Sequence, residues 1–236
     1  MKVSVIIPTL NEEGYIEKTL SALKPQLEKE DELIIVDSYS KDNTVKIAKK
    51  YGAKIYFTER CGIGPAKTFG AKKAKNGILA MLDADGIPAP DWLMRIKGHF
   101  RNNGVAAVAG FGFYPGKTKS KTFLYNSFSW LTFLTGKIYY DFKKIPWMPI
   151  NNYAIRKSTF FSYGGLRKVV CEDFDFGSRA KGLKGVKYDF KLNVSLSDRR
   201  YRKEGFLRTV LLWFLSDLKV ALNGTRICAL DYKVVR

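Results

Sequence analysis

Histidine and cysteine are scarce in this chain of 236 residues, and their scarcity excludes several kinds of chemistry. A histidine base or catalytic triad would depend on His99 alone, which falls on a predicted helix and is expected to be structural. Cys61, Cys171 and Cys228 are odd in number and show no paired spacing. They predict thiols in a reducing compartment rather than a disulfide framework or a zinc site.

Long apolar runs and a secretory leader pattern are also missing. No apolar stretch reaches the roughly 20 residues that a helix needs to span a bilayer. The sequence starts directly with a strand-like segment and shows no signal-peptide pattern. We therefore expect a cytoplasmic protein, either free or peripheral on the cytoplasmic face of a membrane.

Acidic side chains are few in the second part of the chain. Residues 1–100 carry 16 basic and 13 acidic side chains, whereas residues 101–236 carry 25 and 9, and the net charge is +19. A surface this basic predicts an anionic partner: a membrane surface, a phosphorylated acceptor or nucleic acid. The hydrophobic content of 46% and the length fit one well-cored globular domain.

Short β-branched runs alternate with amphipathic segments over the first hundred residues. This alternation predicts an α/β fold with a doubly wound, mostly parallel sheet. The expected strands are residues 3–8, 32–36, 53–57, 78–82 and 105–109. The expected helices are residues 12–23, 42–51, 66–75 and 91–101.

Two aromatic-rich segments follow residue 110. Residues 122–136 hold no charged side chain and are bracketed by lysines, among them Lys121 and Lys137. This pattern fits a helix at a membrane interface and a buried helix of an ordinary domain about equally. Residues 204–223 show a second amphipathic pattern with a wide apolar face, for which packing on the core is slightly favoured over contact with lipid.

Three polar turns follow predicted strands. Residues 8–12 follow the first strand, residues 37–44 the second, and Asp83-Ala84-Asp85 the fourth. Since ligands of open α/β sheets bind at the carboxyl ends of the strands, the three turns are expected to converge on one ligand. Two carboxylates at i and i+2 form a hard oxygen site for a divalent cation shared with phosphates, although each turn alone is also typical of helix capping.

The residues around these turns resemble the family 2 glycosyltransferases, enzymes of the GT-A fold. The resemblance extends over about residues 2–190, and its motifs are specific when taken together. It implies a catalytic domain over residues 1–200, with a nucleotide-sugar half (1–110) and an acceptor half (111–200). Residues 201–236 are then an amphipathic helical extension, packed on the domain or at the membrane surface. The matching stretches are Val5-Ile6-Ile7-Pro8-Thr9-Leu10-Asn11-Glu12, Ile34-Ile35-Val36-Asp37-Ser38, Asp42-Asn43-Thr44, residues 64–74, Leu82-Asp83-Ala84-Asp85, Ala154-Ile155-Arg156-Lys157, Gly164-Gly165-Leu166 and Glu172-Asp173.

The resemblance implies a donor site built from these turns. Thr9, Glu12 and Asp37 are expected to hold the nucleotide base and ribose, with Pro8 on the same side, and Lys67 to lie near the donor phosphates. Ser38 stands where many members carry a second aspartate, which leaves the choice of nucleotide open.

The resemblance also implies the chemistry. Asp83 and Asp85 look like the DXD pair for Mg²⁺ or Mn²⁺, with Asp85 the direct ligand and Asp83 closer to the ribose. Asp173 looks like the catalytic base that takes the acceptor proton. Its segment, without the family match, would predict only an acidic helix N-terminus. The residues expected on the acceptor side are Trp147, Asn152 and Glu172.

A basic element, Ser197-Asp198-Arg199-Arg200-Tyr201, lies beyond the best-matched region. It resembles a Ser-x-Arg-Arg-aromatic element that some branches of the family carry before a C-terminal helix. Because arginine matches phosphate geometry, Arg199 or Arg200 is expected to close over the donor diphosphate. A solvated basic turn and a contact with anionic lipid are the competing interpretations.

Together these patterns predict an inverting, metal-dependent transfer of a sugar from a UDP- or GDP-sugar to a hydroxyl or phosphate acceptor. The basic second part and the aromatic segments favour a lipid-linked or membrane-associated acceptor. One alternative is a GT-A protein that binds a nucleotide sugar without transferring it. The other is a basic nucleic-acid-binding protein. The aromatics do not interleave with arginine and no nucleic-acid module is recognised, so no nucleic-acid partner is expected.

Overall fold

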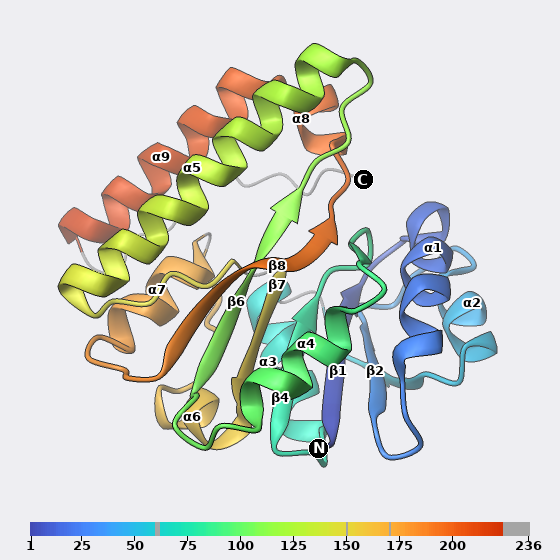
Figure 1. Cartoon of the computed structure of the whole chain (residues 1–236). Coiled ribbons are helices and arrows are strands. Elements are labelled where there is room, and N and C mark those ends of the chain that lie inside the picture. Colours follow the sequence, from blue (N-terminus) through green and yellow to red (C-terminus); the bar gives the residue numbers. More distant parts are fainter. Residues whose placement is uncertain (60–61, 150, 170, 224–236) are drawn as a thin grey trace.

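An eight-stranded sheet forms the centre of the computed structural model, which describes residues 1–59, 62–149, 151–169 and 171–223 (Figure 1). Cys61 and Cys228 lie outside the described residues, and Cys171 is a buried free thiol. The spatial order of the strands is β3-β2-β1-β4-β7-β6-β8-β5. Their bounds are β1 (Val3–Thr9), β2 (Glu32–Asp37), β3 (Lys54–Phe57), β4 (Ile78–Leu82), β5 (Ile87–Pro88), β6 (Ala107–Phe113), β7 (Asn152–Arg156) and β8 (Val186–Ser195).

The sheet is mostly parallel, as predicted. Strands β1 to β4 pair in parallel, and so do β6 and β8. Strand β7 was not predicted, and it lies antiparallel between β4 and β6. The strand expected at residues 105–109 is therefore present as β6, but β7 separates it from β4. Strand β8 was also missed, because only part of its length alternates between buried and exposed side chains.

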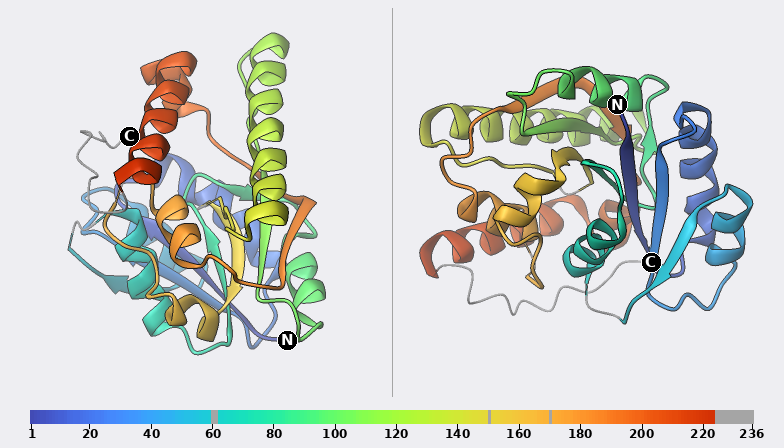
Figure 2. Two further views of the ribbon diagram at one scale, coloured as in Figure 1. Left: turned by 90° about the vertical axis from the view of Figure 1, so that its left-hand side faces the viewer. Right: turned by 90° about the horizontal axis from the view of Figure 1, so that it is seen from below.

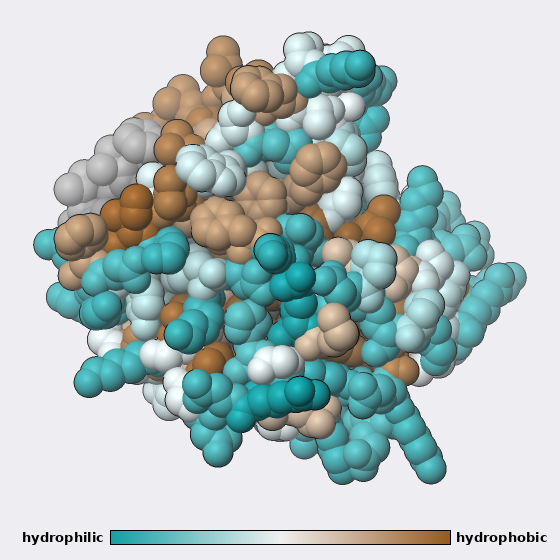
Figure 3. Space-filling view, viewed as in Figure 1, coloured by the Kyte–Doolittle hydropathy of each residue, from teal (hydrophilic) through white to brown (hydrophobic). Residues whose placement is uncertain are grey.

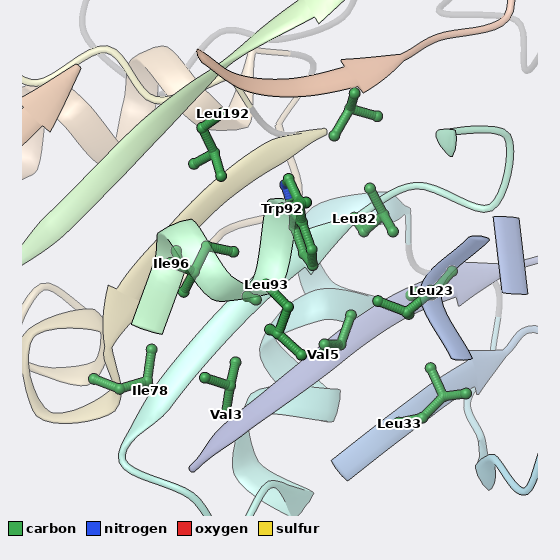
Figure 4. Close-up of a cluster of buried hydrophobic side chains, with 14 of the residues drawn as sticks. Val3, Val5, Leu23, Leu33, Ile78, Leu82, Trp92, Leu93, Ile96 and Leu192 are labelled. Carbon is green, nitrogen blue, oxygen red and sulfur yellow. The ribbon is translucent and has the colours of Figure 1, made fainter. Parts of the chain in front are cut away.

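One face of the sheet is covered by α1 (Glu13–Leu23), α2 (Thr44–Lys50) and α4 (Trp92–Phe100). Val3, Val5 and Ile7 of β1 point to this face and are fully buried in one cluster with the apolar stripe of α1 and with Trp92 (Figure 4). A short 3-10 helix, η1 (Lys24–Gln26), follows α1. The period-2 alternation along β1 thus places successive side chains in two different cores.

The other face is covered by α3 (Ile63–Lys73), α5 (Lys119–Lys143), α6 (Lys157–Ser162) and α7 (Glu172–Arg179). Helix α3 approaches the sheet closely at Gly70, where an added Cβ would lie 2.6 Å from Ile6 and 2.8 Å from Val36. Because the glycine has no side chain, α3 can sit directly on β1 and β2. This contact helps to position Lys67, one turn earlier on α3.

The aromatic segment expected at residues 122–136 lies inside α5, a helix of 25 residues (Figures 1 and 2). Part of it is buried: Tyr125, Phe133 and Tyr140 pack on the domain. Other apolar side chains face outward, with Phe123 76% and Trp130 51% exposed. The helix therefore combines a packed stripe with an exposed apolar stripe.

Two helices complete the described chain, α8 (Arg199–Glu204) and α9 (Phe206–Asn223). The expected boundary between residues 200 and 201 falls within α8, and residues 224–236 of the expected extension lie outside the described residues. Phe206 at the start of α9 packs against Tyr125 of α5 and Tyr201 of α8. Leu207 and Leu211 of α9 are exposed, and apolar side chains gather over α5 and α9 (Figure 3). No helix within the described residues is long and apolar enough to cross a membrane.

Candidate active site

The polar turns after β1, β2 and β4 lie at one edge of the sheet, as the strand pattern predicts. Thr9 and Asp37 are register partners at the ends of β1 and β2, and the Thr9 hydroxyl donates to the Asp37 carboxylate at 2.8 Å. Asp37 also accepts hydrogen bonds from the backbone N–H and the hydroxyl of Ser40. Because Thr9 and Asp37 are buried, this corner is oriented by the fold itself.

The turn after β4 is held by contacts from two sides. The backbone N–H of Gly86 donates to the carbonyl of Asp83 at 3.1 Å. The hydroxyl of Thr19, which is buried on α1, donates to the carbonyl of Ala84 at 2.8 Å. These two hydrogen bonds hold the backbone of the Asp83-Ala84-Asp85 turn in place, and with it the positions from which the two carboxylate side chains extend.

Each carboxylate of the turn is paired with a cationic side chain of the protein. Lys67 is fully buried on α3, and its ammonium lies 2.6 Å from a carboxylate oxygen of Asp83. Asp85 lies 3.1 Å from the Nε of Arg199. Burial raises the pKa of the Asp85 carboxyl to about 6, and the charges of Asp83 and Glu12 act in the same direction, against that of Arg199.

Arg199 also holds Glu12 with both ends of its guanidinium. Its Nη1 and Nη2 donate to the two carboxylate oxygens of Glu12 at 2.7 and 2.9 Å. The guanidinium carbon lies 4.8 Å from the centre of the Tyr15 ring. Arg200 instead pairs with Glu204 of its own helix at 3.3 Å. Of the two arginines that the basic element offers, the structure brings Arg199 to Glu12 and Asp85.

Two further carboxylates begin α7. Glu172 is buried, and burial raises the pKa of its carboxyl to about 8, with the neighbouring charge of Asp173 adding to the rise. Lys67 and Asp83 act on the same carboxyl electrostatically, which places the start of α7 beside the turn after β4. Gly64 of α3 leaves room for Glu172, since an added Cβ there would lie 3.3 Å from the Cβ of Glu172. The predicted base Asp173 thus lies in the same region as the predicted donor residues.

A buried tyrosine from β7 faces this group of carboxylates. Tyr153 is 1% exposed, and its hydroxyl has no hydrogen-bond partner among the described residues. Burial raises the pKa of this phenol, and the charges of Asp173, Glu172 and Asp83 act in the same direction. Tyr153 is paired with Met81 of β4, two residues before Asp83, so the unpredicted strand β7 brings it to the site. Tyr153 was not predicted as a site residue, because β7 itself was not recognised as a strand.

Two other tyrosines lie beside these residues, and no site role was predicted for either. Tyr114 follows β6 and its ring lies 5.1 Å from that of Tyr201 on α8. Burial raises the pKa of Tyr114, and the charges of Tyr201 and Asp85 contribute. An aromatic residue beside a basic element was the available signal for Tyr201, whereas Tyr114 carried none.

The residues predicted for the acceptor side differ in their surroundings. Glu172 lies in the group described above, whereas Asn152 is fully buried in the sheet. The Asn152 amide accepts from the indole N–H of Trp92 at 2.8 Å and donates to the carbonyl oxygens of Phe111 and Leu192. Trp147 packs over Gly136 of α5. In this structure Asn152 and Trp147 thus make packing and hydrogen-bond contacts within the domain. Pro8, which was predicted for the donor side, lies within β1 and is the register partner of Val36 of β2.

The donor set of the turn fits a divalent cation of the Mg²⁺ type. Such a cation is held by one or two carboxylates and completes its shell with water and phosphate oxygens. Asp83 and Asp85 supply two carboxylates on a fixed turn. No cluster of three or more His, Cys, Asp or Glu side chains that could hold a metal occurs among the described residues.

The structure is a mixed α/β domain with a mostly parallel sheet, and solved structures share this fold. The crystal structure of glucosyl-3-phosphoglycerate synthase from Mycobacterium tuberculosis, in complex with Mn²⁺, UDP and glucosyl-3-phosphoglycerate, superposes with a TM-score of 0.63 at 22% identity. The match covers 92% of this chain and 79% of that one. The mixed α/β fold is thus that of the GT-A glycosyltransferases.

The family follows from the sequence comparison. The model for glycosyl transferase family 2 matches residues 4–167, and the chain belongs to this family of glycosyltransferases. Dolichol-phosphate mannosyltransferase from Pyrococcus furiosus is 27% identical over 210 residues, which is 79% of this chain and 60% of that protein. Glycosyltransferase AglE from Haloferax volcanii is 34% identical over 116 residues, 46% of this chain and 38% of that protein. The chain therefore spans less than two thirds of the length of these relatives.

Proposed function

We propose that the protein transfers a sugar from a UDP- or GDP-sugar to a hydroxyl or phosphate acceptor with inversion, in a metal-dependent reaction. The observation that carries the proposal is the convergence of Asp83, Asp85 and Arg199 beside the carboxylates that begin α7. A donor diphosphate at this edge would meet two cationic side chains, Lys67 and Arg199, while a divalent cation held by Asp83 and Asp85 would supply further neutralisation of the leaving group.

Asp173 is the proposed base for a hydroxyl acceptor. Its carboxylate takes the proton of the hydroxyl while the acceptor oxygen forms a bond to the anomeric carbon. The bond from that carbon to the diphosphate oxygen breaks in the same step, and the electron pair leaves with the nucleoside diphosphate. A single displacement from the opposite face gives inversion. Burial raises the pKa of the neighbouring Glu172 carboxyl to about 8, which favours its protonated form near neutral pH, and Asp173 is the member of the pair that we assign as the base.

A lipid-linked acceptor is supported by the apolar surface of α5 and α9. A groove of about 840 Å³ lies between the end of β6 and the first half of α5, and Phe113, Phe123 and Trp130 line it. Lys117 and Lys119 line the same groove, so it offers apolar and cationic groups together. This combination favours peripheral contact with an anionic membrane, where a lipid-linked acceptor would be presented.

The transfer is tested by measuring the turnover of a panel of UDP- and GDP-sugars with and without Mn²⁺. The wild type is expected to turn over at least one donor, faster with Mn²⁺. Asp173→Asn is expected to lower turnover by about 10²–10⁴-fold, since it removes the base. Asp85→Ala should lower it as well, whereas Glu17→Ala, an exposed acid on α1, should not. Unchanged turnover in Asp85→Ala would reject the metal site.

The membrane contact is tested separately by flotation with anionic liposomes at low salt. The wild type is expected to float, and Phe123→Asp together with Leu207→Asp should reduce the floated fraction. These two side chains are 76% and 80% exposed, so the substitutions should leave the core intact. Met94→Asp is the matched control, because Met94 is 68% exposed on α4, outside α5 and α9. Failure of the wild type to float would reject the membrane contact.

A further inference from the structure

The guanidinium of Arg199 bridges two carboxylates that are far from it in the sequence. Glu12 lies 187 residues away, and Asp85 follows a different strand. Glu12 accepts two hydrogen bonds, at 2.7 and 2.9 Å, whereas Asp85 is held by one contact of 3.1 Å. The ring of Tyr15 lies against the guanidinium. The guanidinium of Arg199 therefore neutralises both Glu12 and Asp85, and its contact with Glu12 is the stronger of the two.

The three charged groups are largely withdrawn from solvent. Their side chains are 19% exposed for Arg199, 10% for Glu12 and 15% for Asp85. Electrostatic contacts in such surroundings are screened less than contacts at the surface. Removal of the guanidinium would leave two carboxylates close together without the cation that neutralises them. Asp85 would then attract any other cation more strongly.

Asp85 is also half of the carboxylate pair that fits a divalent cation. A carboxylate oxygen that is paired with a guanidinium offers less charge to a metal ion, so the two cations compete for the same group. The contact of Arg199 with Asp85 is weaker than its contact with Glu12, because two parallel hydrogen bonds are stronger and better oriented than a single ion-pair contact. The contact between Arg199 and Asp85 is therefore expected to break before the hydrogen bonds between Arg199 and Glu12.

We propose that Arg199 is the internal counter-ion of Asp85 while the donor site is empty, and that a divalent cation displaces it from Asp85. During this exchange Glu12 keeps its two hydrogen bonds with the guanidinium, and these bonds orient Arg199 toward the donor diphosphate. Glu12 is then a positioning residue for Arg199 rather than a direct contact of the nucleotide. The presentation to diphosphate rests on the proposed function, whereas the competition of two cations for Asp85 rests on the geometry alone.

The competition is tested with Mn²⁺ in the absence of nucleotide. Free Mn²⁺ is measured by electron paramagnetic resonance during titration of the wild type, Arg199→Met and Arg199→Lys. Arg199→Met is expected to bind Mn²⁺ about tenfold more tightly than the wild type, since one charge-assisted contact no longer competes for Asp85. Arg199→Lys retains the charge and should stay closer to the wild type. Equal or weaker Mn²⁺ binding by Arg199→Met would overturn the proposal.

Arg202→Met is the matched control for this titration. Arg202 lies on the same helix and pairs with Asp198 at 2.7 Å, so its removal changes the net charge equally without touching Asp85. Its Mn²⁺ affinity should equal that of the wild type. A gain as large as that of Arg199→Met would show a general charge effect and would reject the competition. Thermal unfolding of each variant shows whether it is folded. If Arg199→Met is not, Arg199→Gln replaces it, with the same expected gain in Mn²⁺ affinity and the same contradicting outcome.

The positioning role of Glu12 is tested by calorimetric titration of UDP and GDP at saturating Mn²⁺. Arg199→Met is expected to bind the better nucleotide about tenfold more weakly, opposite in sign to its effect on Mn²⁺ alone. Glu12→Gln should cause a similar loss, and the double variant should lose little more than either one. Additive losses would show a direct contact between Glu12 and the nucleotide and would overturn the positioning role. If the wild type binds neither nucleotide, the proposed function fails, while the Mn²⁺ titration still decides the competition.

Discussion

Glu172 is buried at the start of α7, and its titration should control how the stability of the protein depends on pH. Its pKa in the folded protein is about 8, against an ordinary value of 4.5. A raised pKa means that folding favours the protonated carboxyl. The contribution to stability is therefore fully present below pH 4.5 and is lost as the pH rises to about 8. At about 1.4 kcal/mol per pH unit, the loss over this window is at most about 5 kcal/mol.

Glu172→Gln should remove this dependence, because glutamine has nearly the same shape and does not ionise. We expect the variant to match the wild type, or to fall slightly below it, near pH 4.5. At pH 8.5 it should be more stable by several kcal/mol, up to the limit of about 5 kcal/mol that the pKa sets. The measurement is the free energy of unfolding in urea at a series of pH values, for both proteins.

The difference between the two curves isolates Glu172. Asp85 also has a raised pKa, of about 6, so the wild type and the variant share a decline between pH 3.8 and about 6. Glu17→Gln, at an exposed position of α1, controls for the removal of one negative charge. If Glu172→Gln and the wild type lose stability in parallel from pH 5 to pH 8.5, the Glu172 carboxyl is not held protonated by its burial.

Three further predictions concern the residues that support the site. Gly70→Ala should lower the free energy of unfolding by about 1–3 kcal/mol, since the added Cβ would lie less than 3 Å from Ile6 and Val36. Gly98→Ala is the control, because a Cβ there meets nothing within 4 Å. It should raise the free energy of unfolding by about 0.5–1 kcal/mol in the same urea titration. Trp92→Phe should cost about 1–3 kcal/mol, because the buried Asn152 oxygen loses its donor, and calorimetric unfolding would contradict this if the midpoint did not fall. Lys67→Met should lower the free energy of unfolding, because it removes the cation that is paired with Asp83. Asp83→Asn added to Lys67→Met should recover part of that free energy. Strictly additive losses of free energy in the double variant would disprove the pairing.

The first half of the fold was predictable because its signals are local. Residues 3–8 and 78–82 are short apolar runs that end in turn residues, and each became a strand with its carboxyl end at the predicted edge. The alternation of strands and helices also restricts the connections of such strands to a few parallel arrangements. Strand β7 was not predicted, because its position between β4 and β6 depends on pairing with segments about 75 and 45 residues earlier in the chain.

The candidate site divides in the same way. The turns that carry Asp37, Asp83 and Asp85 were identified from the sequence, since each directly follows a recognisable strand. The partners of these residues were not. Lys67 was expected near phosphates, yet the structure pairs it with Asp83, and the basic element offered Arg199 and Arg200 equally before the fold distinguished them.

The sequence by itself determined the class of fold, the edge of the sheet at which polar residues gather, the family and the amphipathic nature of the segments in α5 and α9. These properties follow from periodicity and from motifs within a few residues, which local sequence encodes. Only the tertiary structure decided that Arg199 bridges Glu12 and Asp85, that Tyr153 faces the carboxylates, and that Asn152 is enclosed in the sheet. These arrangements join residues about 20 to 190 positions apart, and their geometry depends on how the sheet and the helices pack together.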